Sequence, residues 1–301
     1  MADGASSART AGWGWTETAL LVMVIVWGVN FSVAKWALGV FDPLAFNALR
    51  FAVASVFVLV VLRAQGALAL PDRADVPRIV VLGLLGNTAY QMCFILGLGR
   101  TLAGHASLIL ALTPIFIALL SLLTGAERPG PRTWAGAALS VVGIALVTGS
   151  GASLEGSDTL AGDLILVGAA AVWAIYTVGA RPLVERYGSV QITAWTMWVG
   201  AVGLVAAGTP ALLRQRWDVG ARAWGGMFFS AIFAIGLAYL IWYRGVERIG
   251  NTRTAIFSNL TPVVAMIAAA LLLSERPSLG SIIGGVLTLT GIAVVRSDRG
   301  A

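Results

Sequence analysis

The sequence predicts an all-α polytopic membrane protein with ten transmembrane helices, arranged as two inverted five-helix repeats. Three observations lead to this fold class. Hydrophobic residues make up 58% of the 301 residues and charged residues only 11%, against roughly half and a quarter in soluble domains. The apolar runs are long enough to cross a bilayer as helices and too continuous for barrel strands. The third observation is an internal repeat with five predicted helices in each copy.

Ten apolar runs, bounded by charged residues or by proline and glycine, are the predicted helices. They lie at 18–38, 43–63, 79–99, 104–124, 133–149, 162–181, 190–212, 223–243, 254–274 and 279–295. The chain then divides into five parts. These are a cytoplasmic tail at 1–16, a first five-helix repeat at 17–149, an external linker at 150–161, a second five-helix repeat at 162–296 and a cytoplasmic tail at 297–301.

The basic residues between the predicted helices favour one orientation. With a cytoplasmic N-terminus, thirteen arginines fall on the cytoplasmic side and six basic residues fall outside. Because cytoplasmic loops carry an excess of Lys and Arg, both termini are predicted to be cytoplasmic. Nineteen arginines against the single Lys35 are typical of a GC-rich bacterial genome. The bacterial inner membrane is therefore the expected location.

The internal repeat is clearest in two segments that lie 148 positions apart. Residues 112–129 read LTPIFIALLSLLTGAERP, and residues 260–277 read LTPVVAMIAAALLLSERP. Residues 27–35, WGVNFSVAK, similarly match 173–181, WAIYTVGAR. The alternative is that all apolar helices look alike, but apolar bias does not readily place Thr-Pro and Glu-Arg-Pro at one offset. Because five is odd, the second copy enters the bilayer from the opposite side, which is the common basis of alternating access.

These motifs, in this order and in duplicate, resemble the EamA-type carriers of the drug/metabolite transporter superfamily, most closely the bacterial amino-acid exporters. The motifs are WG-x-N-F in the first helix, Arg50-Phe51 in the second, the LTP segments, and glycines seven apart in the last helix of each half. The resemblance covers 18–296. It implies a central cavity lined by helices 1, 3, 4, 6, 8 and 9, with helices 5 and 10 as scaffold. It also implies export of small amphipathic metabolites, with aromatic and other neutral amino acids as the leading substrates and drugs or nucleosides as the alternative.

Eight aromatic or polar side chains at predicted membrane depth are candidates for substrate binding. They are Trp27, Asn30, Tyr90, Phe94, Trp173, Tyr176, Tyr239 and Asn259. Residues three or four apart share a helix face, and rings with hydroxyl tips suit an amphipathic ligand. Two interpretations remain open for Asn30, Tyr176 and Asn259, namely a hydrogen bond to substrate or one to another helix. The tryptophans either contact substrate or fill space between helices.

Pro114 and Pro262 lie at matching positions inside the fourth and ninth predicted helices. A proline removes one backbone donor, and here it frees the carbonyls of Leu110 and Ser258. We expect a kink at both sites, with neighbouring hydroxyls or water satisfying the freed carbonyls. A static bend needed for packing fits as well as a hinge. The matched pair favours a gating role for Pro114 and Pro262.

Arg50 lies about two turns inside the second predicted helix, where a charge costs several kcal/mol unless it pairs or extends to the interface. The second repeat carries Thr196 at this position. The preferred interpretation is a structural role, with the guanidinium reaching toward a helix end. The alternative is a site for a substrate carboxylate.

The sequence argues against an intramembrane enzyme and against a channel. The single His105 and the absence of a carboxylate in the middle of any predicted helix provide neither a nucleophile with its base nor a metal cluster. A channel would require a continuous ring of polar residues, which is not visible. The lone Cys93 excludes a disulfide framework, and no phosphate-binding loop occurs.

The expected partners are a small-molecule substrate and the lipid bilayer. We expect no cofactor, no metal and no nucleic acid, because the formal net charge of +6 is spread over loops rather than gathered on one face. The oligomeric state is left open. The small-residue stripe of the last helix in each half predicts close helix packing, either within the chain or between chains.

Overall fold

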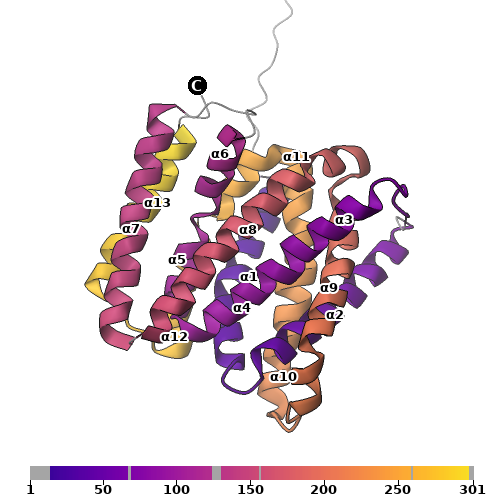
Figure 1. Ribbon diagram of the computed structural model, residues 1–301, viewed down its shortest axis with the longest axis horizontal. Helices are drawn as coiled ribbons and strands as arrows, with labels where there is room; N and C mark the ends of the chain where they lie inside the picture. The colour runs from indigo at the N-terminus through magenta and orange to yellow at the C-terminus, as the bar shows by residue number, and fades with distance from the viewer. Residues whose placement is uncertain (1–13, 67–68, 124–129, 156, 259, 298–301) are drawn as a thin grey trace, which may run out of the picture.

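The structure, a computed structural model, describes residues 14–66, 69–123, 130–155, 157–258 and 260–297 (Figure 1). Within these ranges the chain is almost entirely helical and contains no strand. The elements are α1 (Trp15–Ala37), α2 (Pro43–Ala64), α3 (Val76–Gly83), η1 (Leu84–Ala89), α4 (Tyr90–Arg100), α5 (Ala103–Leu110), α6 (Thr113–Leu123), α7 (Pro131–Glu155), α8 (Ser157–Tyr187), α9 (Ser189–Arg214), α10 (Gly220–Phe228), η2 (Phe229–Leu237), α11 (Ala238–Ser258), α12 (Thr261–Leu273) and α13 (Leu279–Ser297).

Six helical segments of the described chain are long and apolar enough to cross a membrane, and four further apolar helices are shorter. The six are Trp15–Ala37, Pro43–Ala64, Val76–Arg100, Thr159–Tyr187, Ser189–Arg214 and Gly220–Gly245. The shorter ones are Ala103–Ile117, Trp134–Val147, Thr261–Leu273 and Leu279–Gly291. The predicted all-helical membrane class is confirmed for these residues, by length and composition.

Helices α7 and α13 lie side by side at one edge of the molecule (Figure 1). Gly143 on α7 approaches Gly284 and Thr288 so closely that an added Cβ would overlap them, and Gly291 approaches Gly136 in the same way. The low-numbered end of one helix therefore meets the high-numbered end of the other, and the two run antiparallel. The small-residue stripes pack against each other within one chain, because glycine lets two backbones approach closely.

Two helix boundaries differ from the sequence prediction. α11 runs to Ser258 without the expected break at 244–253. That segment, RGVERIGNTR, contains no proline, so nothing in its backbone forces the helix to stop. The chain is also helical on both sides of residue 156, where a linker at 150–161 was expected.

The predicted interruption of the fourth helix is confirmed. α5 ends at Leu110 and α6 begins at Thr113, one residue before Pro114. The hydroxyl of Thr113 donates to the freed carbonyl of Leu110 at 2.8 Å, as expected for a group that proline has deprived of its backbone donor. The corresponding interruption falls between α11 and α12, just before Pro262.

Two π-helical segments, η1 and η2, occupy corresponding places in the two halves. η1 ends directly before Tyr90, and η2 ends two residues before Tyr239. Such insertions are rare, occur frequently at functional sites, and change which side chains a helix directs inward. The sequence alone does not predict them.

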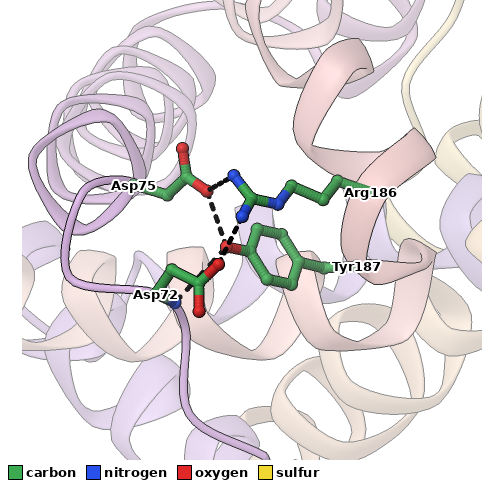
Figure 2. Close-up of polar contacts among 4 residues, drawn as sticks. All are labelled: Asp72, Asp75, Arg186 and Tyr187. Atoms are coloured by element: carbon green, nitrogen blue, oxygen red, sulfur yellow. Dashed lines mark hydrogen bonds and ion pairs between the residues drawn. The ribbon is translucent and has the colours of Figure 1, made fainter.

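Polar contacts connect the α2–α3 loop to the end of α8 (Figure 2). Arg186 forms ion pairs with Asp72 and, at 2.7 Å, with Asp75. The hydroxyl of Tyr187 donates to the same Asp75 carboxylate at 2.6 Å. This cluster connects the first half of the chain to the second at a loop.

Candidate functional site

A cavity of about 210 Å³ lies between the two halves of the bundle. Its wall includes residues from α1, α4, α5, α6, α8, η2, α11 and α12, together with Arg50 from α2. Six of the eight candidate residues line it. They are Trp27, Asn30, Tyr90, Phe94, Trp173 and Tyr239, and the predicted gating residue Pro262 lies in the same wall.

Four aromatic rings frame this cavity in two pairs, each joining one half of the chain to the other. Trp27 contacts Tyr239 with ring centroids 6.3 Å apart, and Trp173 contacts Tyr90 at 4.7 Å. Each tryptophan thus meets the tyrosine of the opposite half. The ring centroids of Trp173 and Tyr239 also lie 6.0 Å apart in an edge-to-face arrangement, a geometry that aromatic pairs prefer. Trp27 is fixed further by its Nε1–H, which donates to the carbonyl of Ala234 in η2 at 2.8 Å.

Asn30 has a buried amide without a partner. Its side chain is 7% exposed, and its Oδ1 accepts no hydrogen bond from the residues that the structure describes. An unsatisfied buried amide costs about 1–3 kcal/mol. Since Asn30 lines the cavity, a ligand there can supply the missing donor.

The structure places the remaining candidates elsewhere. Tyr176 is buried outside the cavity lining. Its ring lies 5.3 Å from that of Trp173 in a tilted arrangement and packs against Gly86 of η1. Its hydroxyl is already within hydrogen-bond distance of Thr196 Oγ1, at 3.0 Å, and of the Tyr243 hydroxyl, at 3.3 Å. Tyr176 thus supports the position of Trp173.

Asn259 lies outside the described residues. Pro114 directly follows the break between α5 and α6 but is not in the cavity lining, whereas Thr113 is.

The guanidinium of Arg50 does not extend toward a helix end, and the preferred structural interpretation was wrong on this point. Nε and Nη2 donate to Asn47 Oδ1 at 3.2 and 2.7 Å, Nη2 donates to Gln91 Oε1 at 2.6 Å, and Nη1 donates to Ser230 Oγ at 3.2 Å. The physical reason is that neutral acceptors on α2, α4 and η2 accept hydrogen bonds from the guanidinium inside the bundle. Extension to the interface is then unnecessary.

The acceptors of Arg50 were not among the sequence candidates. Gln91 also donates from Nε2 to the Tyr239 hydroxyl at 3.2 Å, and Asn47 donates from Nδ2 to the carbonyl of Gln91 at 2.9 Å. One signal was present, because Gln91 and Asn47 are polar residues inside apolar runs, and such residues are usually paired or functional.

The family model for EamA-like transporters matches residues 14–149 and matches again at 160–297. The chain belongs to the EamA-like transporter family. Both matches together cover nearly the whole chain, one for each predicted repeat.

Several known transporters are similar to this chain over nearly their full length. An uncharacterized transporter, YyaM, from Bacillus subtilis is 31% identical over 91% of this chain and 90% of its own. A probable terminal-alkyne amino-acid exporter from Streptantibioticus cattleyicolor is 27% identical over 92% of each chain. A probable amino-acid metabolite efflux pump from Escherichia coli is 27% identical over 91% of this chain and 92% of its own. A solved crystal structure shares the fold, with a TM-score of 0.66, 22% identity, and coverage of 92% of this chain and 96% of the other.

Membership of the EamA-like family makes the chain a membrane transporter. The described part of the cavity wall is mostly aromatic and aliphatic, with an unpartnered amide at Asn30 and one charged residue, Arg50.

Proposed function

We propose that this transporter exports aromatic and other neutral amino acids across the bacterial inner membrane by alternating access. In this proposal ten helices form two inverted five-helix repeats, both termini are cytoplasmic, and the protein acts neither as an enzyme nor as a channel. The two halves rock against each other about the central cavity, as inverted repeats allow.

The observation that carries the proposal is the cavity framed by both halves. Two reciprocal Trp–Tyr contacts, Trp27 with Tyr239 and Trp173 with Tyr90, form its aromatic frame. Its volume of about 210 Å³ is below the roughly 300 Å³ at which pockets for drug-sized ligands begin. The small volume favours amino acids over larger, drug-sized compounds.

The inverted arrangement has independent support. α7 and α13 are matching segments of the repeat, and they pack antiparallel through the contacts of Gly143 with Gly284 and of Gly291 with Gly136. Matching segments that run in opposite directions are what an inverted repeat requires. The two separate family matches, one in each half, agree with a duplicated unit.

The unpartnered amide of Asn30 favours a substrate with a hydrogen-bond donor. The α-ammonium group of an amino acid provides such a donor, and pairing with it would remove the cost of the unsatisfied group. The names of two relatives, an amino-acid exporter and an amino-acid metabolite efflux pump, point in the same direction.

The helix interruptions at Pro114 and Pro262 support a gating role for both prolines. Each interruption breaks the backbone ladder near the cavity, and broken helices in transporters commonly lie beside the substrate site. Bending at these points would let one half move relative to the other around the cavity.

Counterflow in proteoliposomes containing the purified protein tests the proposal. Liposomes loaded with unlabelled amino acid should accumulate the labelled compound, and the uptake should saturate, as expected of a carrier. The screen covers amino acids, nucleosides and cationic drugs. Competition by cationic drugs without any by amino acids would contradict the substrate class, and conductance without counterflow would indicate a channel. The variant Tyr239→Ala should reduce flux per folded molecule, with the folded yield measured alongside to separate loss of the site from loss of the fold.

A further inference from the structure

Arg50 carries a charge for which the described residues contain no counter-ion. The ion pairs among them involve Arg181 and Arg186, both near the end of α8. Arg50 itself is 1% exposed and lies in the cavity wall. Its charge is therefore removed from bulk water and is only weakly screened.

The groups around this guanidinium are all neutral. Four hydrogen bonds go to Asn47, Gln91 and Ser230. The rings of Phe46, Phe51 and Phe94 lie 5.4, 6.0 and 5.5 Å from its central carbon. Amide oxygens and aromatic faces stabilise a cation, but they do not cancel its net charge. The cavity wall thus has a net positive charge at Arg50.

The same contacts hold the guanidinium in one orientation. An arginine has five N–H donors, and the described acceptors occupy four of them, which leaves one N–H of Nη1 for another acceptor. Acceptors on α2, α4 and η2 fix the plane of the group before any ligand arrives. A fixed donor loses little entropy on binding.

We propose that Arg50 binds the carboxylate of the transported substrate. This inference rests on the proposed function and narrows it, because the substrate must then carry an anionic group as well as an apolar body. A carboxylate would supply the missing counter-ion inside a low-dielectric wall, where the attraction between opposite charges is stronger than in water. Charge-assisted hydrogen bonds of this kind are the strong ones.

The competing explanation is that Arg50 only ties α2, α4 and η2 together. Replacing Arg50 would weaken the fold under either explanation, so a variant of Arg50 itself distinguishes the two explanations poorly. The variant Gln91→Glu distinguishes them well. Gln91 Oε1 already accepts from Arg50 at 2.6 Å, and a carboxylate of nearly the same shape would keep this tie. The Tyr239 hydroxyl, which now accepts from Gln91, could donate to the new oxygen instead.

The first arm of the experiment uses the unmodified protein in proteoliposomes. Counterflow is compared for L-phenylalanine against L-phenylalaninamide and for L-leucine against L-leucinamide, at one pH. The two compounds of each pair have the same side chain, and one carries a carboxylate where the other carries an amide. The acids should move at least about tenfold faster than the amides, the range expected when a charge-assisted hydrogen bond is lost.

The second arm compares Gln91→Glu with Gln91→Met. The glutamate neutralises Arg50, so acid counterflow should fall about tenfold or more and the preference for acid over amide should disappear. The methionine removes the same hydrogen bond without adding charge, so the preference for acid should survive at a lower rate. Size-exclusion profiles and unfolding midpoints show whether each variant is folded. If a variant does not fold, the first arm still decides.

The outcomes distinguish the two proposals. Equal counterflow of acids and amides, or an acid preference that persists in folded Gln91→Glu, would overturn the role of Arg50 while the carrier function stands. Failure of every acid and every amide to move would overturn the amino-acid carrier itself, and the role of Arg50 with it.

Discussion

At two matching positions, the halves differ in whether the polar side chains already have their partners. In the first half, Asn30 lines the cavity with an unpartnered oxygen and Arg50 lies in the cavity wall without a described counter-ion. The repeat places Tyr176 and Thr196 at these positions in the second half. There the two side chains hydrogen-bond each other at 3.0 Å, and neither lines the cavity. Equivalent positions thus hold available groups in one half and satisfied groups in the other.

The aromatic rings of the site and its polar groups therefore differ in symmetry. The aromatic frame is symmetric, because each tryptophan contacts the tyrosine of the other half. The polar groups are asymmetric. Duplication accounts for the shape of the cavity, whereas divergence at a few positions accounts for what it recognises. Four predictions test the packing between the halves and the roles of their polar groups, in order of decreasing effect.

Gly143→Ala should disrupt the contact that joins the two halves at α7 and α13. A Cβ at this position would overlap Thr288 and the backbone of Gly284. Overpacking of this kind costs about 1–3 kcal/mol, so the unfolding midpoint in detergent should fall clearly.

Gly168→Ala on α8 is the matched control for Gly143→Ala. An added Cβ there meets nothing within 4 Å. Alanine is favoured over glycine inside a helix by about 0.5–1 kcal/mol, so this variant should be as stable as the original or more stable. Equal midpoints for both variants would show that α7 and α13 do not pack as described.

Asn30→Ala should reduce transport while stability is preserved. The described residues give Asn30 Oδ1 no donor, so its removal breaks no bond and eliminates an unsatisfied group. Amino-acid counterflow should fall by about tenfold, the effect of one lost hydrogen bond to a charged ligand group. A lower unfolding midpoint with unchanged counterflow would instead assign Asn30 to helix packing.

Tyr176→Phe should show the reverse pattern. The variant keeps the ring that packs on Trp173 and loses the hydroxyl contacts with Thr196 and Tyr243. Stability should decrease by about 1 kcal/mol, and counterflow should stay near that of the original protein. If counterflow falls while the midpoint is unchanged, Tyr176 binds substrate, which is one of the two interpretations that the sequence leaves open.

Arg186→Ala should have the smallest effect. Its ion pairs with Asp72 and Asp75 connect the two halves, but the Arg186 side chain is 52% exposed. Exposed pairs contribute about 0–1 kcal/mol and weaken with salt. A small decrease in the midpoint, which disappears at high salt, is expected. A large decrease at all salt concentrations would mean that this loop contact holds the halves together.

The sequence predicted features that depend on local chemistry. Apolar runs determine helices wherever no water is present to satisfy the backbone, and Pro114 determines the interruption after Leu110. The aromatic candidates were found because they recur at matching positions. The sequence does not predict the continuous α11, because the polar segment 244–253 resembles a loop between two apolar helices although its residues permit a helix.

The rest of the site depends on contacts between distant residues. Arg50 contacts Gln91 and Ser230, which lie 41 and 180 positions away in the chain. The periodicity of the sequence does not indicate which distant residues contact each other. The satisfied state of Tyr176 depends in the same way on Thr196 and Tyr243. A polar residue in an apolar run can be recognised from sequence, but the structure decides whether its partner is a neighbouring helix or the cavity.

Thiol accessibility at the two ends of the α7–α13 pair tests most directly whether the halves are opposed. Arg132→Cys lies at the start of α7 and Arg276→Cys lies three residues before α13, both exposed, and each is made in a Cys93→Ala background. In intact cells an impermeant thiol reagent should label residue 276 and reach residue 132 only after permeabilisation. Labelling of both residues from the same side would contradict two oppositely oriented halves around one substrate cavity.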